Sequence, residues 1–229
     1  MVSRGLPNFR NFASIDVGIK VAGTERDVLG RKLANAISQQ LNKGFRAAVP
    51  RIKKQLQEWL RRVIKEQPEY AALVATGPGS LREHFGLVDG PARMDDIIEV
   101  WVQSLFVTLK PIKIVGDSIQ GGIQIGIFKA GWVDVLRRRT ANFTTEKKEN
   151  LPWLEWLLLR GDQVIISDYH IAPGRGRAGG QIMVQKGSWS VPVEFRGTDD
   201  NNFANRAVLQ SIDGMENIIN AELSRTVSM

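Results

Sequence analysis

One long stripe of apolar residues constrains this fold more than any other feature of the sequence. Between residues 28 and 63 an apolar side chain recurs every three or four positions, which is the spacing of one face of an α-helix. At 1.5 Å per residue, a helix over residues 24–65 is about 60 Å long. Pro50 lies inside this stripe, and the apolar register continues on both sides of it. We therefore expect a long N-terminal helix, kinked near Pro50 or broken there into two stacked helices.

The same helix carries the excess charge of the chain. The protein has 31 Lys and Arg against 24 Asp and Glu, which gives a formal net charge of +7. Residues 43–65 contain eight basic residues and Glu58 as the single acidic one, so they account for the whole excess. Such a stripe fits an acidic partner, including DNA phosphates, although a solvated helix face explains the same pattern. The candidate residues facing DNA or an acidic partner are Lys43, Arg46, Arg51, Lys53, Lys54, Arg61, Arg62 and Lys65.

The remaining elements indicate an α+β fold. Residues 1–23 resemble an extended N-terminal arm with a strand near 14–21, and residues 24–229 are expected to form a single domain. Alternating patterns predict a hairpin from residues 106–115 and 122–129, and Asn201 or Asn202 is expected to cap a final helix that ends near Arg225. With two further strands near residues 164–166 and 182–184, we expect one antiparallel sheet of about four or five strands. The long N-terminal helix and the C-terminal helix are expected to pack on that sheet.

Residues 151–195 combine a short helix, two strands and a glycine-rich arm. Pro152 suits a first helical turn, and Gly161 is expected to end the helix in the left-handed conformation. The arm, residues 172–180, is too rich in glycine to be regular and too long for a tight hairpin turn. Such an arm suits a subunit that lies against a neighbour. The candidate subunit-interface residues are Arg175 and Arg177, as planar donors, and Trp189, as an apolar anchor.

Several classes of function are disfavoured by the composition. The chain has no cysteine and only two histidines, which excludes thiol nucleophiles, thiolate zinc sites and histidine-rich metal sites. No stretch reaches the roughly 20 apolar residues needed to span a bilayer. Asp168, His170 and the serines on the returning strand lack the sequence signatures of a hydrolase. Polar residues on the solvent-exposed face of a sheet explain the same pattern. We expect no enzyme activity, no cofactor, no metal and no membrane partner.

Four segments resemble one known protein family. LPWLEWLLLRGD (151–162), GRGRAGGQIM (174–183), WSVPVEFRGT (189–198) and NNFANRAV (201–208) are similar to the second half of head–tail joining proteins of tailed bacteriophages. These are the neck, tail-completion or tail-terminator proteins. The similarity covers roughly residues 80–225, while the basic N-terminal helix matches in type and not in letters.

The resemblance implies a structural virion protein, made in the host cytoplasm and located at the head–tail junction. It implies a homo-oligomeric ring, of six copies or alternatively of twelve, that joins the connector to the tail and leaves a lumen for DNA. The partners it implies are other neck and tail proteins, namely the connector or stopper, the tail tube and the sheath. The alternative function, from a different class, is sequence-independent nucleic-acid binding by the basic helix 43–65.

Overall fold

A computed structural model describes residues 13–22, 28–77, 79–115, 118–127, 132–144 and 150–227. The chain divides into two compact units within the stretch for which the sequence predicted a single domain. Unit 1 comprises Met1–Trp59, Gln103–Lys129 and Ile212–Met229, and unit 2 comprises Leu60–Val102 and Ala130–Ser211. The expected strand of the N-terminal arm is confirmed as β1 (Ala13–Ala22), whereas residues 1–12 and 23 of that arm lie outside the described residues.

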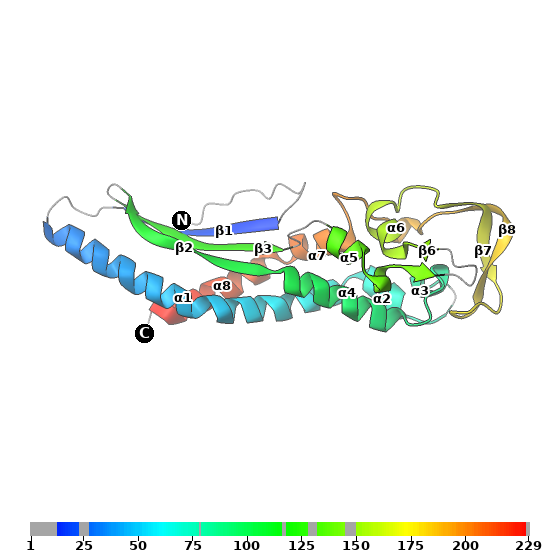
Figure 1. The fold of residues 1–229 in the computed structure, drawn as a ribbon, viewed down its shortest axis with the longest axis horizontal. Coiled ribbons are helices and arrows are strands. Elements are labelled where there is room, and N and C mark those ends of the chain that lie inside the picture. Colours follow the sequence, from blue (N-terminus) through cyan, green and yellow to red (C-terminus); the bar gives the residue numbers. More distant parts are fainter. Residues whose placement is uncertain are drawn as a thin grey trace. The chain divides into compact units, whose positions relative to one another are not determined.

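Unit 1 contains most of the long helix α1 (Val28–Lys65), drawn in blue to cyan in Figure 1. The helix continues through Pro50 without interruption, so the alternative of two stacked helices is wrong and the single long helix is confirmed. Next to it lies an antiparallel sheet with strand order β1-β3-β2, where β2 spans Phe106–Val115 and β3 spans Ser118–Ile127. The predicted hairpin is thus correct, but its second strand begins four residues before the expected start at residue 122.

A bulge in β2 fixes how α1 packs on this sheet. The pairing of β2 with β3 shifts between Lys110 and Lys113, which takes Ile112 out of the ladder. Asn42 supplies the missing partners: its Nδ2 donates to the carbonyl oxygen of Ile112 at 2.8 Å, and its Oδ1 accepts from the Ile112 N–H at 2.9 Å. Ser38 Oγ donates to the same carbonyl at 2.9 Å. A backbone group that leaves the ladder is therefore satisfied by the helix, as buried backbone requires.

Because of this packing, the first turns of α1 turn a different face toward the sheet from the apolar face that the sequence predicted. Ala34 and Ser38 are buried, whereas Leu33 and Ile37, both expected in the core, are 61% and 40% exposed. Further along the helix the predicted stripe is confirmed, with Phe45, Ala48, Ile52, Leu56 and Trp59 all buried.

The predicted C-terminal helix is two helices. Asn202 caps α7 (Phe203–Gln210) as expected, because its side chain accepts from the Asn205 N–H at 3.1 Å. The helix then ends at Ser211, and α8 (Ile212–Val227) follows. In unit 1, α8 packs on α1, where Arg51 Nε and Gln55 Nε2 each donate to the Glu222 carboxylate at 2.8 Å.

Unit 2 has short helices and two small β-pairs. Its elements in chain order are α2 (Pro68–Val74), α3 (Leu81–His84), α4 (Gly90–Ser104), α5 (Val133–Leu136), β5 (Phe143–Thr144), β6 (Asn150–Leu151), α6 (Trp153–Leu159), β7 (Ile166–Pro173), β8 (Gln181–Trp189) and α7, with 3-10 turns at Arg139–Ala141 and Val193–Phe195. In the described residues β5 pairs with β6, and β7 pairs with β8. The α+β class with a long N-terminal helix is confirmed, but the single sheet of four or five strands is wrong: the described part of the chain has three separate small antiparallel sheets.

The predicted short helix is confirmed as α6, which buries Trp153, Leu154, Leu157 and Leu158. Gly161 does follow this helix, but it does not adopt the left-handed conformation. Glycine is needed at this position because no larger residue fits: a Cβ there would lie 2.5 Å from the backbone nitrogen of Gly197.

Candidate functional site

The β7–β8 hairpin is the most distinctive surface feature of unit 2. Within the described strands, β7 and β8 pair only with each other, so each has an outer edge that no further strand covers. A bulge after Ser167 places Asp168 at φ 65°, opposite Lys186 at φ 94° and Gly187 at φ 97°. Such a bulge bends a hairpin and increases its twist.

Large apolar side chains are exposed along this hairpin and its flanks. Two-stranded hairpins are marginally stable in water, and apolar surface is normally buried or used for binding. This hairpin is therefore both marginally stable on its own and rich in exposed apolar side chains. The exposed side chains are Val164, Tyr169, Ile182, Met183 and Val193, between 39% and 72% exposed.

The loop joining the two strands, residues 174–180 (the glycine loop), closes back on its own unit. Ala172 and Pro173 of the predicted arm belong to β7, so the loop is shorter than expected. The N–H of Gly174 donates to the Gly180 carbonyl, and that of Gly176 donates to the Gly179 carbonyl, both at 2.9 Å. A Cβ on Gly176 would lie 1.7 Å from the carbonyl oxygen of Gln181, which no side chain can tolerate. At least part of the glycine content is therefore a requirement of close packing.

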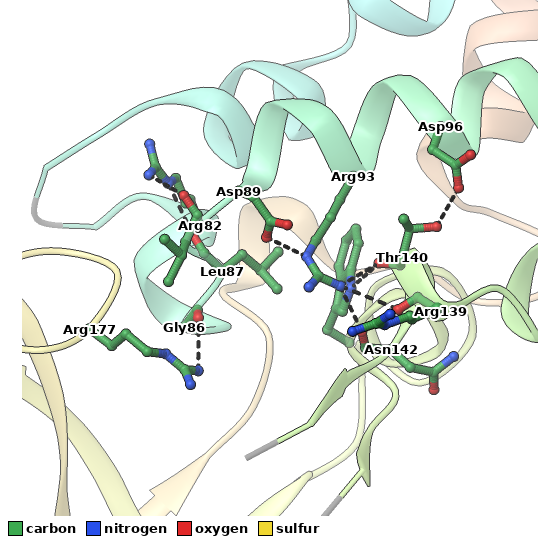
Figure 2. Close-up of polar contacts among 12 residues, drawn as sticks. Arg82, Gly86, Leu87, Asp89, Arg93, Asp96, Arg139, Thr140, Asn142 and Arg177 are labelled. Atoms are coloured by element: carbon green, nitrogen blue, oxygen red, sulfur yellow. Dashed lines mark hydrogen bonds and ion pairs between the residues drawn. The ribbon is translucent and has the colours of Figure 1, made fainter. Parts of the chain in front are cut away.

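The two candidate interface arginines differ in their surroundings. The guanidinium of Arg177 stacks over the Phe143 ring, 3.9 Å from its centroid. Its Nη2 donates to the Gly86 carbonyl at 3.3 Å, as Figure 2 shows. This cation–π contact attaches the glycine loop to its own unit. Arg175 is exposed on the same loop and is available to a neighbour. Neither Phe143 nor Gly86 carried a signal in the sequence that pointed to this contact.

A second arginine fixes the segment that leads to Phe143. Arg93 of α4 pairs with Asp89 at 2.6 Å, and its Nη1 donates to the carbonyls of Thr140 at 3.1 Å and Asn142 at 2.7 Å (Figure 2). Thr140 in turn donates to Asp96 at 2.5 Å. Residues 140–142 are thus held on α4, and they position the ring on which Arg177 stacks.

Trp189 lies in the core of unit 2. It is 6% exposed and contacts Phe85 edge-on, with ring centroids 5.5 Å apart, and Trp156 at 6.3 Å. This burial corrects the expectation that Trp189 anchors a subunit interface, because the ring has almost no surface to offer a neighbour.

Some buried polar atoms near Trp189 lack a hydrogen-bond partner among the described residues. Glu83 accepts the Gly77 N–H with Oε1 at 3.0 Å, but among the described residues its buried Oε2 has no hydrogen-bond partner, and neither has His84 Nδ1. Burial lowers the pKa of His84, more than the nearby carboxylates of Glu194 and Glu83 raise it. A Cβ on Gly179 would lie 2.0 Å from Glu83 Oε1, so the glycine loop closes directly over this carboxylate.

The eight predicted basic residues of α1 separate into two groups. Four form ion pairs within their own unit and four form none among the described residues. The pairs are Arg51–Glu222 at 2.8 Å, Arg61–Glu99 at 2.5 Å, Arg62–Glu66 at 3.8 Å and Lys65–Asp95 at 2.7 Å. The four residues without an ion pair are Lys43, Arg46 and Lys54, which are exposed, and Lys53, which is half-buried; all belong to unit 1.

No catalytic constellation is assembled around the residues considered from the sequence. Asp168 and His170 are both exposed, and His170 Nδ1 donates to the Lys186 carbonyl within the hairpin. Across the described ranges, no three His, Cys, Asp or Glu side chains are grouped so that they could hold a metal ion. In the same ranges, every helix is too short or too polar to cross a bilayer.

Comparisons with protein-family models, with curated proteins and with solved structures found no match to this chain.

Proposed function

We propose that this protein is a structural virion subunit that forms a homo-oligomeric ring at the head–tail junction of a tailed bacteriophage. In this role of neck, tail-completion or tail-terminator protein, a ring of six copies joins the connector to the tail and leaves a lumen for DNA. The proposal rests in part on the four segments that resemble this family. All four, between residues 151 and 208, belong to unit 2, and two of them, 174–183 and 189–198, include residues of β8.

The observation that carries the assembly proposal is the exposed apolar surface of that hairpin. Tyr169, Ile182 and Met183 lie on a two-stranded element with two uncovered edges. Covering these side chains stabilises the hairpin by removing apolar area from water, at about 25 cal/mol per Å². In a cyclic ring each hairpin meets a different surface of the next subunit, and closure leaves no hairpin uncovered.

Replacing the three hairpin side chains tests this proposal. We expect a triple variant Tyr169→Ser, Ile182→Ser and Met183→Ser to stay folded, because none of these side chains is in the core, but to sediment as a monomer where the wild type forms a ring. Analytical ultracentrifugation at several protein concentrations measures the oligomeric state of the wild type and of the triple variant. Rings of unchanged size and stability in the triple variant would contradict the proposed interface.

A matched control removes equally exposed apolar side chains elsewhere in unit 2. Val88, Val133 and Leu209 are 50%, 47% and 39% exposed and lie outside the hairpin. A triple serine variant at these positions should assemble like the wild type. If it also fails to assemble, the effect is one of general surface hydrophobicity and not of the hairpin.

The location in the virion is tested separately. Phage lacking this protein should accumulate DNA-filled heads and unattached tails in electron micrographs of lysates, and supplying the protein in trans should restore complete particles. Complete, infectious particles in its absence would contradict a head–tail role, whatever the oligomeric state of the pure protein.

A further inference from the structure

We infer that one exposed face of α1 in unit 1 binds the phosphate backbone of double-stranded DNA without reading its sequence. This surface, the α1 basic face, consists of Lys32, Lys43, Arg46, Lys53 and Lys54. Lys32 lies outside the range predicted from the sequence, but it is exposed on the same face. The inference goes beyond ring formation and does not depend on it.

The first argument is the position of these cations on the helix. At 100° per residue, all five fall within an arc of about 100°, and Lys32 and Lys54 are about 33 Å apart along the axis. That length is close to one turn of B-form DNA, about 34 Å. From Val28 to Gln57 the helix contains no Asp or Glu, so no acidic side chain of α1 interrupts the face.

The second argument is that these five cations have not been neutralised by the fold. Among the described residues none of the five forms an ion pair. The acidic side chain of α8 that contacts α1 is Glu222, and it is already engaged by Arg51, by Gln55 and by Arg225 at 2.8 Å. The exposed charges of the α1 basic face are therefore available to an external anion.

The third argument is the distribution of charge between the two units. The segments of unit 1 contain 15 Lys and Arg and 8 Asp and Glu, whereas those of unit 2 contain 16 of each. Unit 1 thus carries the entire net charge of +7. A long-range positive potential of this kind attracts polyanions and speeds their association.

The character of the face favours DNA over an acidic protein. Protein interfaces depend on buried aromatic and apolar anchors and are depleted in lysine. The residues between these cations on the same face are small or polar: Ala36, Gln39, Ala47, Pro50 and Gln57. Lysine is a flexible point charge that suits phosphate, and four of the five cations are lysines. Contacts of this kind position a duplex and do not specify its bases.

The test measures binding of the purified full-length protein to labelled 30-base-pair duplexes of two unrelated sequences, by fluorescence anisotropy at several salt concentrations. The face variant replaces Lys43, Arg46, Lys53 and Lys54 with Gln. Loss of four phosphate contacts should make the plot of log K against log salt less steep, by about 3.6 in the magnitude of its slope. At 0.1 M salt this corresponds to a loss of affinity on the order of a thousand-fold. The two duplexes should bind equally well. The melting temperature should not change, because the replaced side chains are unpaired.

A control variant removes four charges from unit 2, by replacing Arg137, Arg138, Arg139 and Lys186, all exposed, with Gln. It has the same net charge as the face variant and should lose less than threefold in affinity. Equal losses in both variants, or a wild type that does not bind DNA at 50 mM salt, would overturn the inference. Polyglutamate that binds the face as tightly as DNA would assign it instead to an acidic protein surface. None of these outcomes depends on whether rings form.

Discussion

Replacing Arg206 with Met is the sharpest test of the energetics of unit 2. Glu69, in the first turn of α2, is fully buried, and Arg206 of α7 pairs with its Oε1 while remaining 26% exposed. Burial raises the pKa of Glu69, and the charge and hydrogen bond of Arg206 act in the opposite direction. The Oε2 atom of Glu69 has no partner in the structure. Without Arg206, this carboxylate is therefore left buried and uncompensated.

The expected cost can be estimated from this geometry. Removing one partner of a buried ion pair destabilises a protein by about 3–5 kcal/mol. For a chain of this size each kcal/mol lowers the melting temperature by roughly 2–4 °C, so we expect a decrease of about 6–20 °C at pH 7. The double variant Glu69→Gln with Arg206→Met has no buried charge at this pair and should be more stable than Arg206→Met alone at that pH.

The pH dependence separates this explanation from a simple loss of packing. Without Arg206, the folded-state pKa of Glu69 rises further above its unfolded value of about 4.3. The variant is then most stable below that value, and it loses stability as pH rises toward the folded pKa, by up to about 1.4 kcal/mol per pH unit. Thermal melts of Arg206→Met and of the double variant between pH 4 and 8 measure this. Equal stability of the two at pH 7, or a difference that does not shrink toward pH 4, would refute the assignment of a buried ionised carboxylate.

Three further outcomes are expected from thermal melts. Trp153→Ala should cost about 3–5 kcal/mol, because the ring is fully buried; Trp156→Ala should cost less, since that ring is half-exposed, and an equal loss would contradict this ranking. Asn202→Ala removes the N-cap of α7 and should cost about 1 kcal/mol; Asn202→Asp keeps the capping acceptor but loses the Nδ2 donor to the Thr198 carbonyl in a fully buried site, so it should also be less stable than the wild type. The hydrogen bond from Arg51 lowers the pKa of Glu222, so its contribution is present above its unfolded pKa and is lost as pH falls through the lower folded value. Glu222→Gln should accordingly be less stable than wild type at pH 7, with a difference that narrows below about pH 4.

Local features of the sequence predicted local structure well. The three-to-four-residue spacing identified α1, the apolar density around Trp153 identified α6, and an asparagine before an apolar run identified the cap of α7. Each of these depends on residues within a few positions of one another, where spacing and propensity determine the geometry.

Pairings between distant segments could not be predicted in the same way. An alternating pattern marks a strand and its buried face but does not name its partner. The sequence therefore gave no sign that β1 pairs with β3, about a hundred residues away, while β7 and β8 form a separate sheet. The rotation of α1 that buries Ser38 and exposes Leu33 follows from the β2 bulge, whose unpaired Ile112 needs the Ser38 and Asn42 side chains. That requirement arises only once the sheet exists.

The candidate site was predicted in part. The glycine-rich arm and the basic stripe were identified from the sequence as candidate interaction surfaces, but the role of each residue in them depends on partners far along the chain. Glu222 and Asp95 neutralise part of the stripe from α8 and α4, and Phe143 engages Arg177. Lys32 could have been found from sequence, because the acid-free stretch begins at residue 28 and not at residue 43.

The close packing of the glycine loop has a consequence for how this chain can diverge. At Gly176 a Cβ would meet the Gln181 carbonyl, and at Gly179 it would meet the Glu83 carboxylate. At Gly176 the obstructing atom belongs to the backbone, and at Gly179 a φ of 155° disfavours any side chain, so selection should preserve both glycines in any descendant that keeps this hairpin. Arg175, exposed between them and the strand, is under no such constraint and can follow the surface of whatever neighbour it meets. Diverged copies should therefore differ at residue 175 while keeping residues 176 and 179, so that the surface of the loop changes without a change in its shape.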